Sequence, residues 1–170
     1  MYDIAIIGTG IVGAITAREL TKYNLSVCLL EKASDVSDGA TKANSGIVHA
    51  GFDAKPNTKK ALFNVKGAAL MPDLCVALGV TYCQNGSLVI AFDEEEMEVL
   101  QELIERGKQN GVKDISLLSQ SEVLALEPNL SRNIIGALHA PTAGIVSPYE
   151  LAIAATRLCD GQWSRLISKF

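Results

Sequence analysis

The sequence has few of the residues that build metal centres. It contains 4 cysteines among 170 residues, none of them spaced as Cys-x-x-Cys, and only 2 histidines. These numbers and spacings do not match a zinc site, so we expect no bound metal. The cysteine spacing also shows no pattern of disulfide pairs, which fits reduced thiols, as in a cytoplasmic protein.

Basic clusters are missing as well. Lys and Arg number 15 against 19 Asp and Glu, the net charge is −4, and no run of five basic residues occurs. A protein that binds nucleic acid usually shows a basic patch or stripe. We therefore expect no nucleic-acid partner.

Long hydrophobic runs and leader features are absent too. No apolar run has the length of a membrane span, and the first residues lack the basic region of a signal peptide. The remaining composition, 48% hydrophobic and 20% charged, is ordinary for a soluble globular protein. We expect a cytoplasmic location and leave peripheral membrane docking open.

The first thirty residues carry a strand–helix–strand pattern. Ile4–Ile7 is an apolar run that ends at a glycine, Ile11–Tyr23 has helical apolar spacing, and Ser26–Leu30 is a second apolar run. A crossover unit that joins two parallel strands has this length. The pattern therefore predicts a parallel sheet.

A Gly-x-Gly-x-x-Gly turn follows the first strand. Gly8 would permit the tight turn, Gly10 would let a pyrophosphate approach the backbone, and Gly13 would let the helix pack closely. The free N–H groups at the helix start, around Ile11 and Val12, would favour phosphate. An unrelated glycine-rich turn is the alternative interpretation.

Glu31 ends the second strand, eighteen residues after Gly13. A carboxylate there can accept hydrogen bonds from ribose hydroxyls and would repel a 2′-phosphate, which argues against NADP. The preceding strand, the helix and this acid together predict a dinucleotide site. They do not separate FAD from NAD.

The rest of the chain does not continue a simple alternation of strands and helices. Residues 32–54 predict a long, partly helical loop, and 57–78 predict a helix that Pro72 kinks or breaks. Further strands are expected at 80–82, 87–92, 115–118 and 134–140, and helices at 93–110, 119–127 and from Pro148. A second subdomain fits this order better than a longer doubly wound sheet.

A second loop offers small residues to a ligand. Ser45 and Gly46 lie in the stretch 41–52 and would let the backbone approach a flat ring. An ordinary polar loop explains the same residues equally well.

Four segments together resemble a known family. They are Asp3–Lys32, Asn44–Gly51, Asn85–Leu88 and Pro141–Pro148. They look like the D-amino-acid-oxidase-type FAD superfamily, and within it most like anaerobic-type glycerol-3-phosphate dehydrogenases and L-2-hydroxyglutarate oxidases. The resemblance covers residues 2–158 and does not separate these two subfamilies.

The resemblance implies an α/β fold: a Rossmann-like FAD-binding domain with a parallel sheet, plus the beginning of an inserted α+β substrate domain. The expected domains are 1–78 for the ADP moiety of FAD, 79–146 for the partial substrate or cap domain, and 147–170 for a return helix and an atypical tail. FAD would be bound noncovalently. Its ADP moiety would contact Gly8, Gly10, Gly13, Glu31 and Lys32, and its pyrophosphate and ring would contact Thr41, Asn44, Ser45 and Gly46.

His49 is the candidate catalytic residue. Oxidation of an alcohol carbon by hydride transfer to flavin N5 also requires that the hydroxyl proton leave, and an imidazole titrates near neutral pH. His49 could instead donate a hydrogen bond to the flavin, or be a structural histidine in a turn. His139 lies in a strand pattern, and we expect a structural role for it.

Three lysines follow the second loop, namely Lys55, Lys59 and Lys60. They could attract an anionic small-molecule substrate that carries a phosphate or a carboxylate. A solvated helix face explains them too, and we favour that interpretation.

The chain is short for the family that it resembles. Residues 159–170 do not resemble the segment with which the family continues into its next strand. A shortened product, or a gene disrupted by a frameshift, would explain this difference. Exposed apolar patches and self-association would follow.

Three functions remain open. The first is an FAD-dependent dehydrogenase or oxidase of a small hydroxy acid or polyol phosphate, with an electron acceptor or a membrane as partner. The second is a non-catalytic FAD-binding fragment or gene remnant. The third is an amino-acid or amine oxidase of the same superfamily, which the Asn44–Gly51 segment disfavours.

Overall fold

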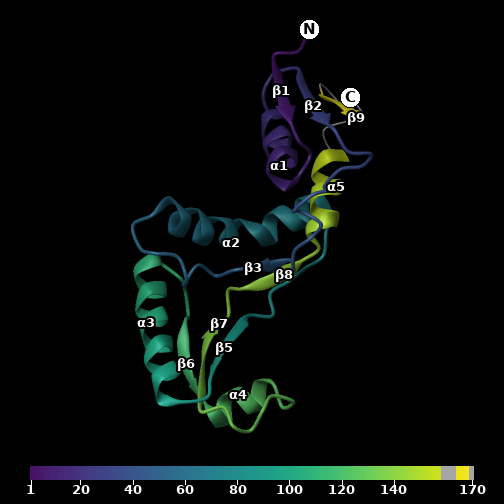
Figure 1. Cartoon of the computed structure of the whole chain (residues 1–170). Coiled ribbons are helices and arrows are strands. Elements are labelled where there is room, and N and C mark those ends of the chain that lie inside the picture. The colour runs from purple at the N-terminus through teal and green to yellow at the C-terminus, as the bar shows by residue number, and fades with distance from the viewer. Residues whose placement is uncertain (158–163, 169–170) are drawn as a thin grey trace. The chain divides into compact units, whose positions relative to one another are not determined.

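The computed structural model describes residues 1–157 and 164–168. The chain divides into two compact units, and each is described by itself (Figure 1). The first unit consists of Met1–Gly46, Asp73–Thr81 and Val146–Phe170, and the second of Ile47–Pro72 and Tyr82–Ile145. The domain bounds expected from the sequence stay a prediction.

The first unit contains the predicted crossover. Strand β1 (Ile4–Ile7), helix α1 (Ile11–Leu20) and strand β2 (Val27–Glu31) follow one another, and the two strands pair in parallel. The register places Ile6 beside Leu29, and α1 covers this face through Ala17. The parallel sheet predicted from the apolar runs is confirmed.

The loop after β2 differs from the expectation. We expected residues 32–54 to be partly helical, but the described backbone there forms turns and one short strand, β3 (Ile47–Val48). Hydrogen bonds between side chains and nearby backbone groups take the place of the backbone hydrogen bonds of a helix. The side chain of Asn44 binds the carbonyl groups of Ala40 and Thr41, and Ser37 adopts a left-handed φ of 62°.

Helix α5 (Pro148–Arg157) closes the described part of the first unit before the tail. It packs against α1 and buries Leu151, Ala152 and Ala155. The tail contains a strand that we did not expect, β9 (Ser164–Ser168), which pairs with β2 in parallel, so that the sheet order is β1-β2-β9. The other residues of the atypical tail, 158–163 and 169–170, lie outside the described residues.

Among the described residues, the second unit contains two three-stranded sheets. Strand β3 pairs with β8 (Gly144–Val146), which pairs with β4 (Tyr82–Cys83). The other sheet has the order β5-β7-β6, from β5 (Ser87–Ala91), β7 (Gly136–Ala140) and β6 (Ser116–Ser119). We expected residues 84–86 to form a turn between two strands. The strands on either side, β4 and β5, belong to different sheets.

Helices α3 (Glu94–Asn110) and α4 (Gln120–Leu126) cover the second sheet. Both begin as the sequence predicts. The Asp93 side chain accepts a hydrogen bond from the N–H of Glu96, and Ser119 forms a capping box with Glu122. Gly111 ends α3 with a left-handed φ of 84°.

Helix α2 (Lys59–Leu78) runs without a break through Pro72. Of the two expected outcomes, a kink or a break, the break is not seen, and buried residues lie on the helix both before the proline, at Ala68, and after it, at Cys75. In the part of the chain that the structure describes, α2 alone is long and apolar enough to cross a membrane. Length and composition do not distinguish such a span from a helix that packs within a protein.

Candidate cofactor-binding site

The glycine turn has the geometry that the sequence predicts. Gly8 adopts a φ of 95°, and its N–H donates to the carbonyl of Leu30 over 2.8 Å. A Cβ on Gly13 would lie 2.0 Å from the carbonyl oxygen of Gly8, which no side chain tolerates. Glycine at position 13 therefore lets the first turn of α1 contact the backbone of the loop.

Gly10 lies at the N-terminal end of α1, close to the side chain of Thr41. It is the N-cap residue and supplies no side-chain cap. A Cβ built on it would meet only the Thr41 hydroxyl, at 3.1 Å. That hydroxyl accepts a hydrogen bond from the N–H of Ile11 over 3.0 Å, so Thr41 occupies one of the helix-start donors that a phosphate would use.

Glu31 points toward the glycine turn. One carboxylate oxygen accepts hydrogen bonds from the N–H and the hydroxyl of Thr9, over 2.8 and 2.7 Å, and the other accepts from the N–H of Ala33 over 3.0 Å. The backbone donors, Ala33 first and then Thr9, lower the pKa of Glu31 to about 2. The group is therefore an anion at neutral pH. A carboxylate offers about four acceptor positions, and these donors already use most of them.

Thr9 was not selected from the sequence, although it is a central partner in this arrangement. It is fully buried, and its carbonyl accepts a hydrogen bond from the N–H of Ser37 over 3.3 Å. Its place between two glycines and its short polar side chain were the only signals available. Thr9 thus joins the glycine turn to Glu31 on one side and to the following loop on the other.

The following loop is shaped by its own side chains. Asn44 accepts a hydrogen bond from the N–H of Gly46 over 2.8 Å. Gly46 is buried with a φ of 69°, and a Cβ on it would lie 2.2 Å from the carbonyl oxygen of Val146. Asn44 and Gly46 therefore hold the backbone in place, while Ser45 and Lys32 are exposed and available to a ligand.

Two contacts fix the middle of this loop. The Tyr149 hydroxyl on α5 donates to the Asp35 carboxylate over 3.1 Å, and Lys42 forms an ion pair with Asp38. Asp35 raises the pKa of Tyr149, and Asp38 raises the pKa of Lys42. The sequence had no signal for the contact to Tyr149, because the two residues are 114 positions apart.

His49, the candidate catalytic residue, belongs to the second unit. Its side chain is exposed, and its carbonyl accepts a hydrogen bond from Asn64 over 3.2 Å. His49 lines a cavity of about 550 Å³ whose other lining residues include Lys60, Asn64 and Phe52. Lys55 and Lys59 are exposed.

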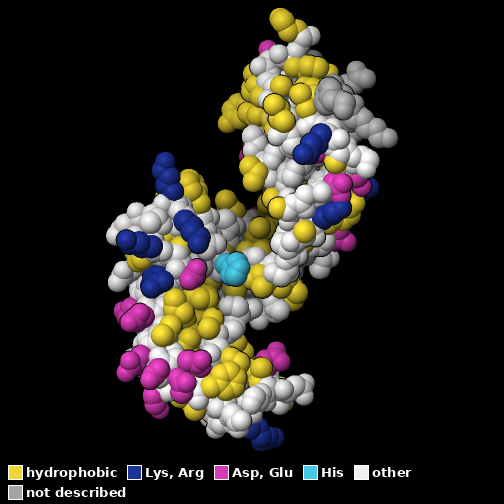
Figure 2. All heavy atoms as spheres, viewed as in Figure 1, with side chains coloured by type: hydrophobic (Ala, Val, Ile, Leu, Met, Phe, Trp, Pro, Cys, Tyr) yellow, Lys and Arg dark blue, Asp and Glu magenta, His cyan; other side chains and the backbone are white. Residues whose placement is uncertain are grey.

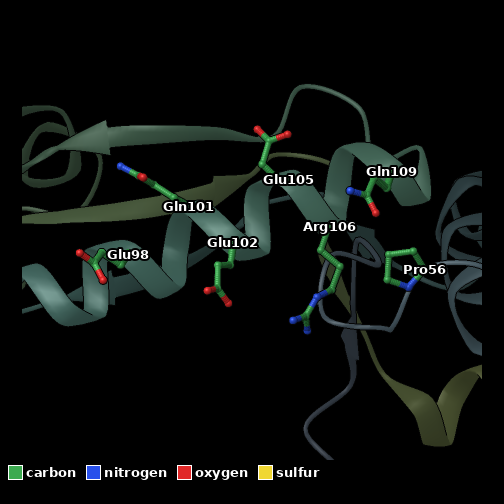
Figure 3. Close-up of a pocket in the computed structure, with 7 residues that line it drawn as sticks. All are labelled: Pro56, Glu98, Gln101, Glu102, Glu105, Arg106 and Gln109. Atoms are coloured by element: carbon green, nitrogen blue, oxygen red, sulfur yellow. The ribbon is translucent and has the colours of Figure 1, made fainter.

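A larger cavity of about 660 Å³ runs along α3, shown in Figure 3. Its acidic lining residues are Glu98, Glu102 and Glu105, and the Arg106 guanidinium donates to the carbonyl of Asp53. Three carboxylates beside one arginine do not favour an anionic ligand. Among the described residues, no group of three or more His, Cys, Asp or Glu side chains is arranged to hold a metal ion.

Comparison with known proteins agrees with this geometry. The family model of FAD dependent oxidoreductases matches residues 3–163. The chain is 53% identical over 154 residues to the glycerol 3-phosphate dehydrogenase of Caloramator mitchellensis, covering 91% of this chain and 32% of the relative. It is 38% identical to the mitochondrial L-2-hydroxyglutarate dehydrogenase of Dictyostelium discoideum, covering 89% of this chain and 34% of the relative.

Among solved structures, L-alpha-glycerophosphate oxidase from Mycoplasma pneumoniae with FAD bound superposes with a TM-score of 0.92 at 30% identity, covering 98% of this chain and 44% of that one. Glycine oxidase from Geobacillus kaustophilus gives 0.89 at 28% identity, covering 98% and 46%. The chain thus spans about a third of the length of these curated relatives and less than half of these structures. The match to the family model covers most of the chain and confirms both the predicted fold class and the predicted FAD cofactor, and the chain belongs to the family of FAD dependent oxidoreductases.

Proposed function

We propose that this chain forms the ADP-binding side of an FAD-dependent oxidoreductase that oxidises a small anionic hydroxy acid or polyol phosphate. The observation that carries the proposal is the ionised Glu31 bonded to Thr9 in the glycine turn that leads into α1. Glycerol 3-phosphate and L-2-hydroxyglutarate are the proposed substrates, since relatives at 53% and 38% identity carry these names. We place the enzyme in the cytoplasm.

The residues of the first unit fit the ADP half of FAD. Gly8, Gly10 and Gly13 form the turn that leads into α1, and the N–H groups of Ile11 and Val12 belong to the start of this helix. A diphosphate at this helix end would be stabilised by these donors and by the helix dipole. Thr41 would exchange its bond to Ile11 for a bond to the phosphate, and Glu31 would accept from the ribose.

FAD, when bound, would supply the hydride acceptor for the substrate carbon, and the substrate hydroxyl would have to lose its proton. We assign His49 to hold that proton, because its imidazole is exposed in the same cavity as Lys60, whose cation suits an anionic substrate. A hydrogen bond from His49 to the flavin, or a structural role in the turn, are the alternatives. General-base help is typically worth about 10²–10⁴-fold, so His49→Ala in a full-length relative should lower kcat at least about tenfold.

The function is tested by flavin uptake followed by dye reduction. Purified chain is incubated with FAD, freed of excess cofactor, and its flavin absorbance is compared with protein concentration. Near-unit stoichiometry is expected, and Glu31→Ala should lower it. Dye reduction is then measured with glycerol 3-phosphate, L-2-hydroxyglutarate and glycine. Reduction with glycine alone would favour the amino-acid oxidase alternative.

A second candidate is a non-catalytic FAD-binding fragment, which would bind the ADP moiety and turn nothing over. The chain spans 32% of the Caloramator mitchellensis relative. Uptake of FAD without dye reduction by any of the three substrates would support this candidate. A chain that takes up no FAD would contradict both functions.

A further inference from the structure

The segment of residues 50–54, which follows His49, is buried although it belongs to neither a helix nor a strand. It connects β3 to the turn before α2. Ala50, Phe52 and Ala54 are at most 8% exposed. Buried backbone carbonyl groups need hydrogen-bond partners, and a segment outside helices and strands cannot obtain them from a regular backbone pattern. Its partners must therefore come from elsewhere in the second unit.

Two side chains of α3 bind the carbonyl groups of this segment. The side-chain amide of Asn110 donates to the carbonyl oxygens of Gly51 and Ala54, over 2.9 and 2.7 Å. The Arg106 guanidinium donates to the carbonyl oxygen of Asp53 over 3.1 Å. An amide nitrogen carries two N–H donors, so Asn110 can serve both of its carbonyl groups at once. Asn110 thus joins the two ends of a four-residue turn.

The sequence of α3 places these two donors together. Arg106 and Asn110 are four residues apart and therefore lie on one face of the helix, and Figure 3 shows Arg106 on it. Gly107 permits a close approach, because a Cβ on it would lie 3.0 Å from the Cβ of Phe52. Gly111 ends the helix directly after Asn110 with a left-handed φ. The amide of Asn110 is therefore held at a fixed helix end.

Helix α2 holds the segment from a second direction. Gly51 has a φ of 109°, and a Cβ on it would lie 2.6 Å from the Cγ2 of Val65. The side-chain amide of Asn64 donates to the carbonyl oxygen of His49 over 3.2 Å. The backbone from His49 onward is therefore in contact with both helices.

This segment forms part of the wall of the cavity into which His49 is exposed. The cavity of about 550 Å³ is lined by His49 and by Gly51, Phe52, Asp53 and Ala54, whereas Asn110 is not one of its lining residues. Figure 2 shows a histidine side chain that reaches the surface, with hydrophobic side chains beside it. A displacement of a reacting group by about 1 Å can cost about 10²-fold in rate. The bonds to the segment therefore matter for the position of His49.

We infer that Asn110, assisted by Arg106, is a positioning residue that holds the segment 50–54 and, through it, the imidazole of His49. The inference rests on the proposed function, in which His49 holds the substrate proton. Neither donor touches the substrate, and both act through the carbonyl groups of the segment. These hydrogen bonds form without flavin, so the position of His49 can be measured in the chain alone.

The test compares the same chemical change at two neighbouring residues of α3. Asn110→Asp keeps the size of the side chain and replaces its N–H donors by an oxygen, and Gln109→Glu makes this change at an exposed residue drawn in Figure 3. Asn110→Ala removes the donors without adding a charge. The sequence has two histidines, so NMR of the imidazole C–H groups gives two sets of signals, which His139→Gln assigns.

We expect both Asn110 variants to shift or split the His49 signals and to leave those of His139 on β7 unchanged. Gln109→Glu should change neither set. Unchanged His49 signals in both Asn110 variants overturn the inference. Equal changes at His49 and His139 overturn it too, because they indicate a general loss of structure. If the Asn110 variants do not fold, which circular dichroism shows, Arg106→Met decides by the same signals, since it removes the bond to the segment and keeps an apolar stem.

Turnover gives a second readout on the FAD-loaded chain. Displacement of His49 in Asn110→Asp should lower kcat at least about tenfold and change KM less than about threefold, whereas Gln109→Glu should change neither. A change in KM alone, or a loss confined to FAD uptake, overturns the positioning role. An unsubstituted chain that reduces no dye contradicts the proposed function, and the NMR result without flavin then decides the inference by itself.

Discussion

Glu31 joins the end of β2 to the glycine turn, and its three hydrogen bonds all favour the ionised carboxylate. Bonds to a charged acceptor contribute more than neutral ones, about 1.5–3 kcal/mol each at most. Glu31→Gln retains the size of the side chain and removes the charge. We expect it to lower the free energy of unfolding at pH 7 by about 1–2 kcal/mol, measured by urea titration. The exposed Glu150→Gln on α5 serves as the control and should change it by less than about 0.5 kcal/mol.

The same carboxylate predicts a pH dependence. The pKa of Glu31 in the folded chain is about 2, below its ordinary value of 4.5. A lowered pKa stabilises the folded state fully above the unfolded pKa, and this contribution is lost as the pH falls from about 4.5 toward 2. Over that interval the unsubstituted chain should lose stability more steeply than Glu31→Gln. Parallel curves for the two proteins would mean that Glu31 is not bonded as described.

Gly13 makes a steric prediction at the same turn. An added methyl group would lie 2.0 Å from the Gly8 carbonyl oxygen, so Gly13→Ala must displace either α1 or the loop. Overpacking of this kind costs about 1–3 kcal/mol, and FAD uptake should fall with it. Gly67→Ala is the matched control, since nothing lies within 4 Å of its added methyl group and it belongs to α2. That control should raise stability by about 0.5–1 kcal/mol. Thermal unfolding and flavin absorbance measure both variants.

At the scale of elements, α5 positions the loop that follows β2. The Tyr149 hydroxyl bonds to Asp35 across a separation of 114 residues. Tyr149→Phe removes this bond and keeps the ring, and an exposed hydrogen bond of this kind contributes about 0.5–1 kcal/mol. Amides of residues 35–46 should therefore exchange faster, while those of β2 should not change. Tyr23→Phe, on another exposed tyrosine of the first unit, should leave both sets unchanged.

Helices and strands that are determined by residues close to them in the sequence could be predicted from the sequence. The bounds of α3 follow from Asp93 and Gly111, and those of α4 from the capping box at Ser119, because caps act within one turn of the helix. The crossover from β1 to β2 follows from apolar runs and three glycines. The position of Glu31 near the glycine turn also followed from this pattern, because Glu31 ends the second strand of the crossover.

Contacts between distant residues could not be predicted in this way. The bond from the Ile11 N–H to Thr41, and the bond from the Ser37 N–H to the Thr9 carbonyl, join segments separated by about thirty residues. Neither contact leaves a periodic pattern. Pro72 shows the opposite case, where the local preference for a break yields to packing on either side of it.

At the scale of the whole molecule, the candidate residues divide unequally between the two units. The residues assigned to the ADP moiety and to the nearby loop belong to the first unit, and His49 belongs to the second. The chain also spans only about a third of its curated relatives. Binding of the ADP half and completion of the catalytic site are therefore separable properties, and different ligands can report on each.

ADP and FMN separate these properties, because each is a part of FAD. A ligand that binds only the folded chain stabilises it by about 2.7 kcal/mol at a concentration of 100 times its Kd. If the first unit holds the ADP moiety, ADP should raise the unfolding temperature to nearly the same extent as FAD at equal ligand concentration, whereas FMN should raise it little. Glu31→Ala should reduce the effect of ADP, since the ribose loses its acceptor. A larger shift with FMN than with ADP would show that the flavin ring is the anchored part, and no shift with any ligand would mean that this chain does not retain the cofactor.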